Sequence, residues 1–537
     1  MSDETIAASA TPPRRRLGLS TAIFALATGL SRIVGLGREV VAASYFGTSG
    51  PASAFTIASQ IPNLMSNLFA QAALSAAFVP VFTDLLQQGR KREAFKLAST
   101  LFWIILIALG ALTAIGILLA GVIMPLFTGP KFNGTLDHLT AGLAQVLFPV
   151  VLLLGLTGLL VGILQSYDEF SIPALAPAVW NLVILVLLVA LHTQFQGGKR
   201  LYAYAIAWLV GTVVQGLMVA WALKRIDFRL RLVLDWRDTR VRQVFVLMLP
   251  VTIGLGIVNF DQLLNSFFGT LVSSQAPRAI DNAFRIYMLP QGIFSVAVAT
   301  VLFPTLSRQA ARRAPEEMRR TVGNGLRQIN LLLIPAAGLL VALATPITRL
   351  VYQRANFGPE STHLVSIALF WFAFSLPFGG LNLLLTRTFF ALQRPWIPTR
   401  LAAMNLVVDI VVSVALYKPL GIAGLVIGTA VANAVMTALQ LHRLRTGFNG
   451  RLEGPQTLMI TARVLLASTI VMVLARIVWG LLDGLLGRSL PGQVVSVGVA
   501  IGLAVYVYAR AVLRMRIPEA RQIEALVLGR LGRRPAA

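Results

Sequence analysis

Two arginines lie inside the first long apolar stretch of the chain, and their position is the clearest sign of chemistry in the sequence. Arg32 and Arg38 fall within residues 17–46, a stretch too apolar for a soluble surface helix. A guanidinium in hydrocarbon costs about 2.5–3.5 kcal/mol on insertion scales, and it cannot escape that cost by losing its proton. We therefore expect both side chains to face a water-filled cavity or an anion.

The spacing of these arginines limits what they can hold. Six residues along an α-helix place two side chains about 120° apart around the axis and about 9 Å along it. The pair therefore suits one large anion better than one small ion. Glu39 lies seven residues after Arg32, on the same helix face, and is a candidate partner for either arginine. With Arg285, in the corresponding part of the second half, we predict three anion ligands; structural ion pairs are the alternative.

A second set of polar side chains lies inside apolar segments of the C-terminal half. Asn405 and Asp409 are four residues apart and share one face of a helix. Asp261 and Thr429 lie in two other apolar segments. Such hard oxygen ligands suit a sodium ion or a proton relay. An interhelical hydrogen-bond network is the alternative interpretation, and the residues alone leave both open.

The composition predicts an all-α polytopic membrane protein. The 537 residues are 56% hydrophobic and only 12% charged, whereas average soluble chains are about 25% charged. A spanning helix needs about 20 apolar residues. Fourteen candidate spans are centred near residues 30, 68, 110, 150, 183, 211, 255, 293, 332, 376, 407, 432, 471 and 502. The chain has no cysteine, which excludes a disulfide framework and a thiol nucleophile.

The basic residues behind the net charge of +25 lie mainly on one side of the predicted spans. If the N-terminus is inside, the segments on the inner side hold 32 Lys or Arg residues and the outer segments hold eight. Such a bias follows the positive-inside rule and predicts that both termini are cytoplasmic. The basic segments are then explained by topology and by attraction to anionic lipid, so we expect no nucleic-acid partner.

The two halves of the chain resemble each other at an offset near 225 residues. Ser-Tyr-Phe-Gly-Thr at 44–48 matches Ser-Phe-Phe-Gly-Thr at 266–270, and Pro62 and Pro80 match Pro290 and Pro304. Six spans in each unit give both units the same orientation, with a pseudo-twofold axis along the membrane normal. Parallel repeats of this kind are a transporter architecture with the substrate site between the halves. The paired prolines predict bends inside the second and eighth spans.

This pattern divides the chain into five parts. We predict a polar cytoplasmic tail, an N-lobe of six spans, a C-lobe of six spans, two additional spans and a basic cytoplasmic tail. Their ranges are 1–16, 17–225, 226–445, 446–515 and 516–537.

The chain resembles the MurJ (MviN) lipid II flippases of the bacterial inner membrane, which belong to the multidrug/oligosaccharidyl-lipid/polysaccharide exporter superfamily. The resemblance covers about residues 17–515. It is carried by the Ser31-Arg32, Gly35 and Arg38-Glu39 group, by Ala54-Phe55, Ile61-Pro62-Asn63, Leu68-Phe69-Ala70 and Ala77-Phe78-Val79-Pro80, by Arg285, Leu289-Pro290 and Ala299-Thr300, and by Gly424-Leu425 and Thr429.

The resemblance implies two six-helix lobes and two extra helices that line a groove for a lipid tail. It places the central basic residues of the family on Arg32, Arg38 and Arg285, and a sodium site on the set Asp261, Asn405, Asp409 and Thr429. It also implies that further cavity residues contact the substrate, namely Glu39, Ser53, Asn63 and Gln71.

Several cavity positions depart from the family pattern. Ser53 and Gln71 replace common acids, Ser66 and Asn67 stand where members have arginine, and Phe284 replaces a usual Asp. Arg394 also stands where members carry an acid. The polar cavity of this chain is thus expected to hold fewer charges than is usual in the family.

We therefore expect an inner-membrane flippase that moves lipid II to the outer leaflet by alternating access. No Gly-rich Lys-Ser/Thr motif for ATP is present, so the driving force would be the membrane potential or an ion gradient, with sodium the one candidate cofactor. The alternatives are a flippase for another polyprenyl-pyrophosphate glycan, a cation-coupled drug exporter and a non-transporting scaffold. A membrane glycosyltransferase is disfavoured because every predicted outer loop is short, and we expect no enzymatic activity.

Overall fold

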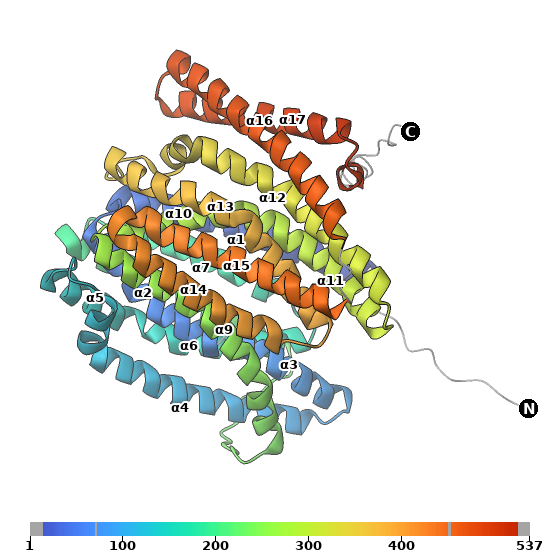
Figure 1. Cartoon of the computed structure of the whole chain (residues 1–537). Coiled ribbons are helices and arrows are strands. Elements are labelled where there is room, and N and C mark those ends of the chain that lie inside the picture. The colour runs from blue at the N-terminus through green and yellow to red at the C-terminus, as the bar shows by residue number, and fades with distance from the viewer. Residues whose placement is uncertain (1–13, 70–71, 449–452, 523, 525–537) are drawn as a thin grey trace, which may run out of the picture. The chain divides into compact units, whose positions relative to one another are not determined.

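The computed structural model describes residues 14–69, 72–448, 453–522 and 524, and every regular element within them is helical. Figure 1 shows these elements in chain order. The α-helices are α1 (Arg14–Phe46), α2 (Gly50–Phe69), α3 (Ala72–Gln87), α4 (Lys91–Ile123), α5 (Gly134–Leu147), α6 (Pro149–Ser166), α7 (Ser171–Leu191), α8 (Leu201–Ala222), α9 (Thr239–Val272), α10 (Ala276–Pro290), α11 (Val296–Ala311), α12 (Pro315–Tyr352), α13 (Pro359–Ala391), α14 (Trp396–Leu420), α15 (Ile422–Gly447), α16 (Gly454–Leu486) and α17 (Leu490–Arg514).

Eleven helical segments among the described residues are long and apolar enough to cross a membrane. They coincide with eleven of the fourteen predicted span centres. The other three centres, near residues 30, 68 and 255, fall on α1, on α2 and on α9. These helices contain side chains outside the described set, and the search for spans covers only described residues. The predicted all-α polytopic fold is confirmed.

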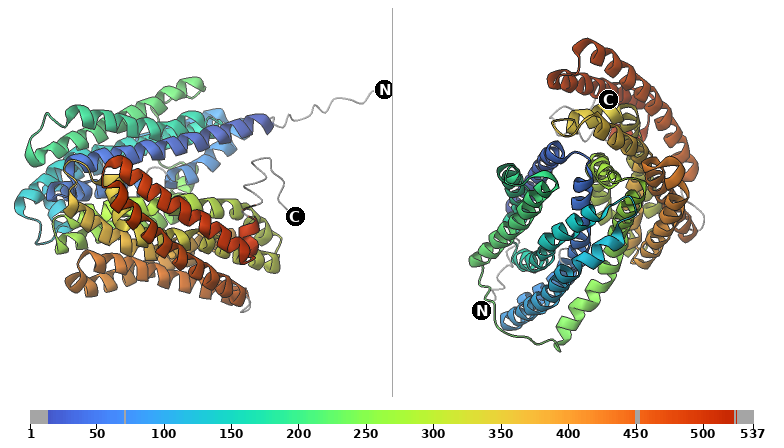
Figure 2. Two further views of the ribbon diagram at one scale, coloured as in Figure 1. Left: turned by 90° about the horizontal axis from the view of Figure 1, so that it is seen from above. Right: turned by 90° about the vertical axis from the view of Figure 1, so that its left-hand side faces the viewer.

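The chain forms two compact units. The first contains residues 1–42, 58–124 and 138–256, and the second contains residues 43–57, 125–137 and 257–537. Within the first unit, α6 packs against α3, α4 and α8, and α7 packs against α8. Within the second, α13 packs against α12 and α15, and α14 packs against α15. Figure 2 shows the long helices of each unit running side by side. The five-part division made from the sequence remains a prediction.

The internal repeat is visible in the order of the elements. In each half a long helix, α1 or α9, is followed by a pair of shorter helices, α2 and α3 or α10 and α11. In the second half the pair is joined by a π-helix over Gln291–Ser295, directly after Pro290. Proline removes a backbone donor from the helix, and single π turns relieve such local mismatches. The irregularity that the sequence predicts at Pro290 is therefore a local change from α-helical to π-helical hydrogen bonding.

The last two long helices form a hairpin on the second unit. α16 packs along α12 and α17, and their apolar side chains form clusters with Leu331, Ile334 and Leu343 of α12. At one end of this hairpin, buried Arg327 of α12 pairs with Glu453 at 2.8 Å and with Glu519. These two acids flank the hairpin in sequence. The contacts attach α16 and α17 firmly to the second unit.

Candidate functional site

The side chain of Arg38 is enclosed by aromatic residues in the first unit. It is 4% exposed, and its guanidinium carbon lies 4.9 Å from the ring centre of Trp180 on α7 and 5.0 Å from that of Trp208 on α8. Such cation–π contacts contribute about 2 kcal/mol or more when they are desolvated. The two indole faces hold the guanidinium plane at a fixed position in the span.

Glu39 completes this group. Its carboxylate forms an ion pair with Arg38 at 2.5 Å and accepts a hydrogen bond from the Tyr204 hydroxyl at 3.1 Å. Glu39 is therefore the partner of Arg38, one of the two possibilities that the spacing left open. The Nε and Nη1 atoms of Arg38 are buried and have no hydrogen-bond partner among the described residues. These two atoms can donate to an additional acceptor.

Arg32 has very different surroundings on the same helix. It is exposed and forms no hydrogen bond or ion pair with any described residue. Asn63 is half-buried on α2 and lines a narrow space together with Trp208, the residue that stacks on Arg38. The first unit thus brings Arg38 and Asn63 to the same tryptophan, with Glu39 paired to Arg38. Gln71 lies outside the described residues.

The third predicted arginine lies in the second unit, on α10. Arg285 donates from Nε to Asp281 at 3.1 Å, and Arg278 donates to the same carboxylate oxygen at 3.0 Å. One carboxylate oxygen of Asp281 therefore accepts from both arginines of α10. Ser53 is fully buried nearby, where its hydroxyl accepts a hydrogen bond from the backbone N–H of Arg278 at 3.2 Å. In this unit Ser53 thus supports the helix that carries the arginines.

An aromatic cluster occupies the position next to Arg285. The ring of Phe284 stacks on Tyr287 with centroids 5.6 Å apart, and both rings contact Phe372 of α13. From the resemblance, we expect other members of the family to have an acid at the position that Phe284 occupies in this chain. Here the phenyl ring lies among other rings, so this part of α10 contributes no charge.

The second predicted set converges in part on Asp409. This residue is 3% exposed on α14. It accepts hydrogen bonds from Asn265 at 3.0 Å, Ser413 at 3.2 Å and Thr429 at 3.4 Å. The carboxyl group of Asp261 lies next to it, and Asp261 Oδ1 is buried with no partner among the described residues.

Two carboxyl groups so close together repel each other unless a proton or a cation lies between them. The donor set consists of oxygens, which is the chemistry that a hard cation such as sodium requires. Gly428 of α15 permits the close packing, because a Cβ at this position would lie 2.7 Å from Asp409 Oδ1. The residues therefore fit a sodium ion, and they fit a shared proton equally well.

The hydrogen-bond partners of Asp409 differ in part from the predicted set. Asn405 is half-buried and forms no hydrogen bond with this cluster among the described residues. Asn265 and Ser413 take its place. Each lies four residues after a named acid, the same spacing that paired Asn405 with Asp409, so the signal was present in the sequence. No group of three or more His, Asp or Glu side chains suited to a metal occurs in the described part of the chain.

Comparison with known proteins decides the family. The family model described as lipid II flippase MurJ matches residues 42–497. The chain belongs to the MurJ family. A protein of Bdellovibrio bacteriovorus named "Probable lipid II flippase MurJ" is 29% identical over 500 residues, which cover 92% of this chain and 94% of that protein. A protein of Rhizobium tropici with the same name is 31% identical over 82% of this chain and 83% of its own length.

Solved structures place the MurJ fold of this chain in a wider group. The structure "Lipid II flippase MurJ, inward closed conformation" matches with a TM-score of 0.76 and 21% identity, over 92% of this chain and all of that one. An inward-facing multidrug resistance transporter of the MATE family matches with a TM-score of 0.64 and 16% identity, over 80% of this chain and 94% of that one. These matches concern the fold. MurJ membership and the many apolar helices together indicate a multi-pass protein of the bacterial inner membrane.

Proposed function

We propose that this chain is a lipid II flippase, which moves the lipid-linked peptidoglycan precursor from the inner to the outer leaflet. The observation that carries the proposal is the similarity to proteins named lipid II flippase MurJ over nearly the whole length of both chains. A flippase for another polyprenyl-pyrophosphate glycan is the second candidate, since the arginines would recognise the same pyrophosphate.

The physical requirements of flipping agree with the residues described above. Lipid II joins a charged pyrophosphate and a sugar-peptide head to a long polyprenyl tail. Guanidinium groups form charge-assisted, bidentate hydrogen bonds with phosphate oxygens. Among the described residues, two buried nitrogens of Arg38 have no acceptor and Arg32 has no partner. Arg285 donates to Asp281 together with Arg278. We assign Arg32, Arg38 and Arg285 to the pyrophosphate, and Glu39, Ser53, Asn63 and Gln71 to its surroundings.

The remaining parts of the proposal concern energy and orientation. The chain would transport its substrate without a chemical reaction, with both termini in the cytoplasm. Asp261, Asp409, Thr429 and the newly found Asn265 would bind sodium, and the ion would supply coupling when bound. The oxygen donors and the buried, unpartnered Asp261 Oδ1 support this assignment.

Replacement of an essential lipid II flippase tests the function directly. The gene is expressed in a bacterial strain from which its own lipid II flippase is depleted. We expect growth and normal cell shape, with lipid II reaching the outer leaflet in intact cells. Lysis of the strain despite correct membrane insertion of this chain would contradict the proposal. Transport of another polyprenyl-linked glycan by the same cells would favour the second candidate.

A further inference from the structure

The facing sides of α13 and α15 carry two rows of polar side chains inside candidate membrane spans. The row on α15 consists of Asn433, Thr437 and Gln440, and the row on α13 consists of Ser375, Asn382 and Thr386. At 100° per residue, each row stays within about 60° around its helix axis. We call these six residues the polar seam.

The two rows of the polar seam are hydrogen-bonded to each other. Side-chain hydrogen bonds join Asn433 to Ser375 at 2.9 Å, Thr437 to Asn382 at 2.8 Å and Gln440 to Thr386 at 3.0 Å. The residue numbers rise together on the two helices, so successive pairs follow one another along the membrane-spanning direction. The polar seam is therefore a continuous line of hydroxyl and amide groups and not a single crossing point.

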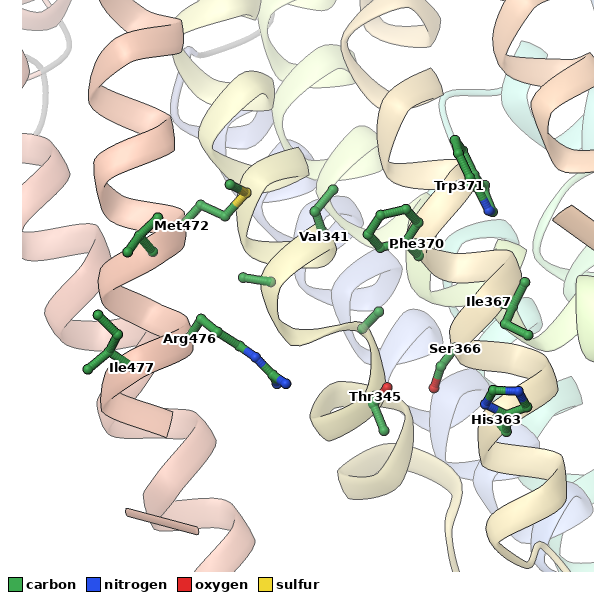
Figure 3. A pocket seen from close by; sticks show the side chains of 13 residues that line it. Val341, Thr345, His363, Ser366, Ile367, Phe370, Trp371, Met472, Arg476 and Ile477 are labelled. Carbon is green, nitrogen blue, oxygen red and sulfur yellow. The ribbon is translucent and has the colours of Figure 1, made fainter. Parts of the chain in front are cut away.

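The polar seam is separate from the apolar cavity of this unit. Ser366 lies nine residues before Ser375, which is half a turn around the axis of α13. Together with Ile367 and Phe370 it lines a cavity between α12, α13 and α16 (Figure 3). The seam runs along the side of α13 that faces α15.

One end of the polar seam leads to the aspartate pair. Thr429 lies four residues before Asn433, on the same face of α15, and its hydroxyl donates to Asp409 at 3.4 Å. Asp409 is 3% exposed, and Asp261 lies next to it. An ion that binds these carboxyl groups must therefore cross part of the protein to reach them.

The other end of the polar seam contains an unpartnered acceptor. Gln440 is fully buried, and its Oε1 atom has no hydrogen-bond partner among the described residues. A buried acceptor without a donor is costly, and a water molecule or a cation at this position would remove the cost. Gln440 lies seven residues before the end of α15 at Gly447, about 10 Å along the axis. On the topology proposed above, this end of α15 faces the cytoplasm.

We propose that the polar seam is the cytoplasmic access route for the ion that binds Asp261 and Asp409. The route rests on the proposed function, which assigns a sodium ion to this pair. Hydroxyl and amide oxygens are suitable ligands for a hard cation, and polar side chains inside spans mark ion pathways. Adhesion between helices also uses such residues, but it explains neither the unpartnered Oε1 of Gln440 nor the line that leads from it to Asp409 over about 16 Å.

Silver ions test the route, because the chain has no cysteine and one introduced thiol can be followed alone. Silver is a monovalent cation, and soft metal ions bind thiolate sulfur. It is added in chloride-free buffer to inside-out membrane vesicles, and the thiols that remain are counted with a maleimide after denaturation. We expect Thr437→Cys to react at least tenfold faster than Ala438→Cys. Ala438 is the matched control, because it lies at the same depth but is exposed outside the seam.

A second substitution tests the cytoplasmic end of the route. Gln440→Leu removes the amide and keeps most of the volume, so it should slow the reaction of Thr437→Cys at least tenfold. It should leave the effect of sodium on the melting temperature unchanged, because equilibrium binding at Asp409 does not depend on the route. Thr386→Cys repeats the test from α13, with the 47% exposed Phe390 replaced by Cys as its control; it serves if Thr437→Cys does not fold.

Two results would overturn the route. One is an equal reaction rate at the seam and control positions, which would make the polar seam a dry interhelical contact. The other is faster reaction of Thr437→Cys in right-side-out vesicles, which would place the access on the outer side. Silver access in a protein whose melting temperature does not respond to sodium would reject sodium as the ion and leave the route standing. None of these results depends on lipid II transport, which the depletion strain tests separately.

Discussion

Arg38 and Arg32 lie six residues apart on α1, and the difference in their surroundings separates stability from substrate binding. Arg38 is fixed by two tryptophans and by Glu39, whereas Arg32 has no partner among the described residues. Removing one member of a buried ion pair leaves the other charge uncompensated, at a cost of about 3–5 kcal/mol. A partner-free arginine has no such effect on folding.

We predict that Arg38→Ala lowers the melting temperature strongly and abolishes lipid II transport. Arg32→Ala should abolish transport and leave the melting temperature near that of the wild type. The measurements are thermal unfolding of the purified variants and complementation in the depletion strain, with membrane levels checked by immunoblot. Full complementation by either variant would remove that arginine from the substrate site.

A double variant separates the two roles of Arg38. Replacing a buried ion pair by apolar residues often leaves stability unchanged or increases it. Arg38→Met combined with Glu39→Met should therefore recover most of the melting temperature that Arg38→Ala loses. Transport should remain absent, because no guanidinium is present to bind phosphate. Recovery of transport together with stability would mean that Arg38 is purely structural.

At this scale the sequence located charged residues inside the spans but did not predict their partners. Charge inside a span singled out Arg38 and Asp409, because an ionisable group in hydrocarbon is conspicuous without any structure. Trp180 and Trp208, which enclose Arg38, are more than 140 residues away in sequence. Other tryptophans, such as Trp103 and Trp371, also lie in the long helices, so nothing in the pattern of residues distinguished these two. Only the packing of α7 and α8 beside α1 revealed them.

At the scale of elements, the junction between α10 and α11 is the irregular part of the second unit. The π-helix over Gln291–Ser295 packs against α13 at Gly380. A Cβ on Gly380 would lie 2.2 Å from Leu333 Cδ1 and 2.6 Å from Ser295 Oγ. The absent side chain therefore allows three elements to approach one another closely.

We predict that Gly380→Leu displaces the π-helix from α13 and destabilises the protein by about 1–3 kcal/mol, the usual range for overpacking. The thermal unfolding midpoint should fall, and amide exchange should rise at residues 291–295. Gly484→Leu on α16 is the matched control, since a Cβ there meets nothing within 4 Å. Equal melting temperatures for the two variants would show that the close packing at Gly380 contributes nothing.

Hydropathy and proline placement predicted most of the elements. An apolar run of sufficient length must form its backbone hydrogen bonds internally in a membrane, which leaves little choice but a helix. The proline rule located the irregularity at Pro290. It did not predict a π-helix, because proline only removes a hydrogen bond, and the neighbouring packing of Gly380 and Ser295 determines how the backbone adapts.

For the whole molecule, the distribution of charge predicts how the chain crosses the membrane. Basic residues are concentrated in segments on one side of the spans, and this bias sets orientation during insertion. Reporter fusions after Ala537 and within the loop at Gly197 should report opposite sides of the membrane, with Ala537 in the cytoplasm. The same side for both fusions would overturn the fourteen-span topology.

The second unit connects three of its long helices through one carboxylate. Asp409 of α14 accepts hydrogen bonds from Asn265 of α9 and Thr429 of α15, and Asp261 of α9 lies beside it. A cation bound there would attract both carboxyl groups and hold the three helices together. A difference in ion affinity between two arrangements of these helices would be enough to bias transport toward one of them.

Sodium should therefore raise the melting temperature of the wild type. A ligand that binds only the folded state stabilises it by about 2.7 kcal/mol when present at 100 times its dissociation constant. Asp409→Asn removes one negative charge but keeps the shape and the capacity to hydrogen bond, so this variant should lose most of the response. Asn405→Ala is the matched control on the same helix, because Asn405 forms no hydrogen bond with the cluster among the described residues. Its sodium response should equal that of the wild type. Melting curves of the wild type that coincide in NaCl and KCl at equal ionic strength would exclude sodium. The two aspartates would then share a proton. Asp261, Asn265, Asp409 and Thr429 would serve as an interhelical hydrogen-bond network.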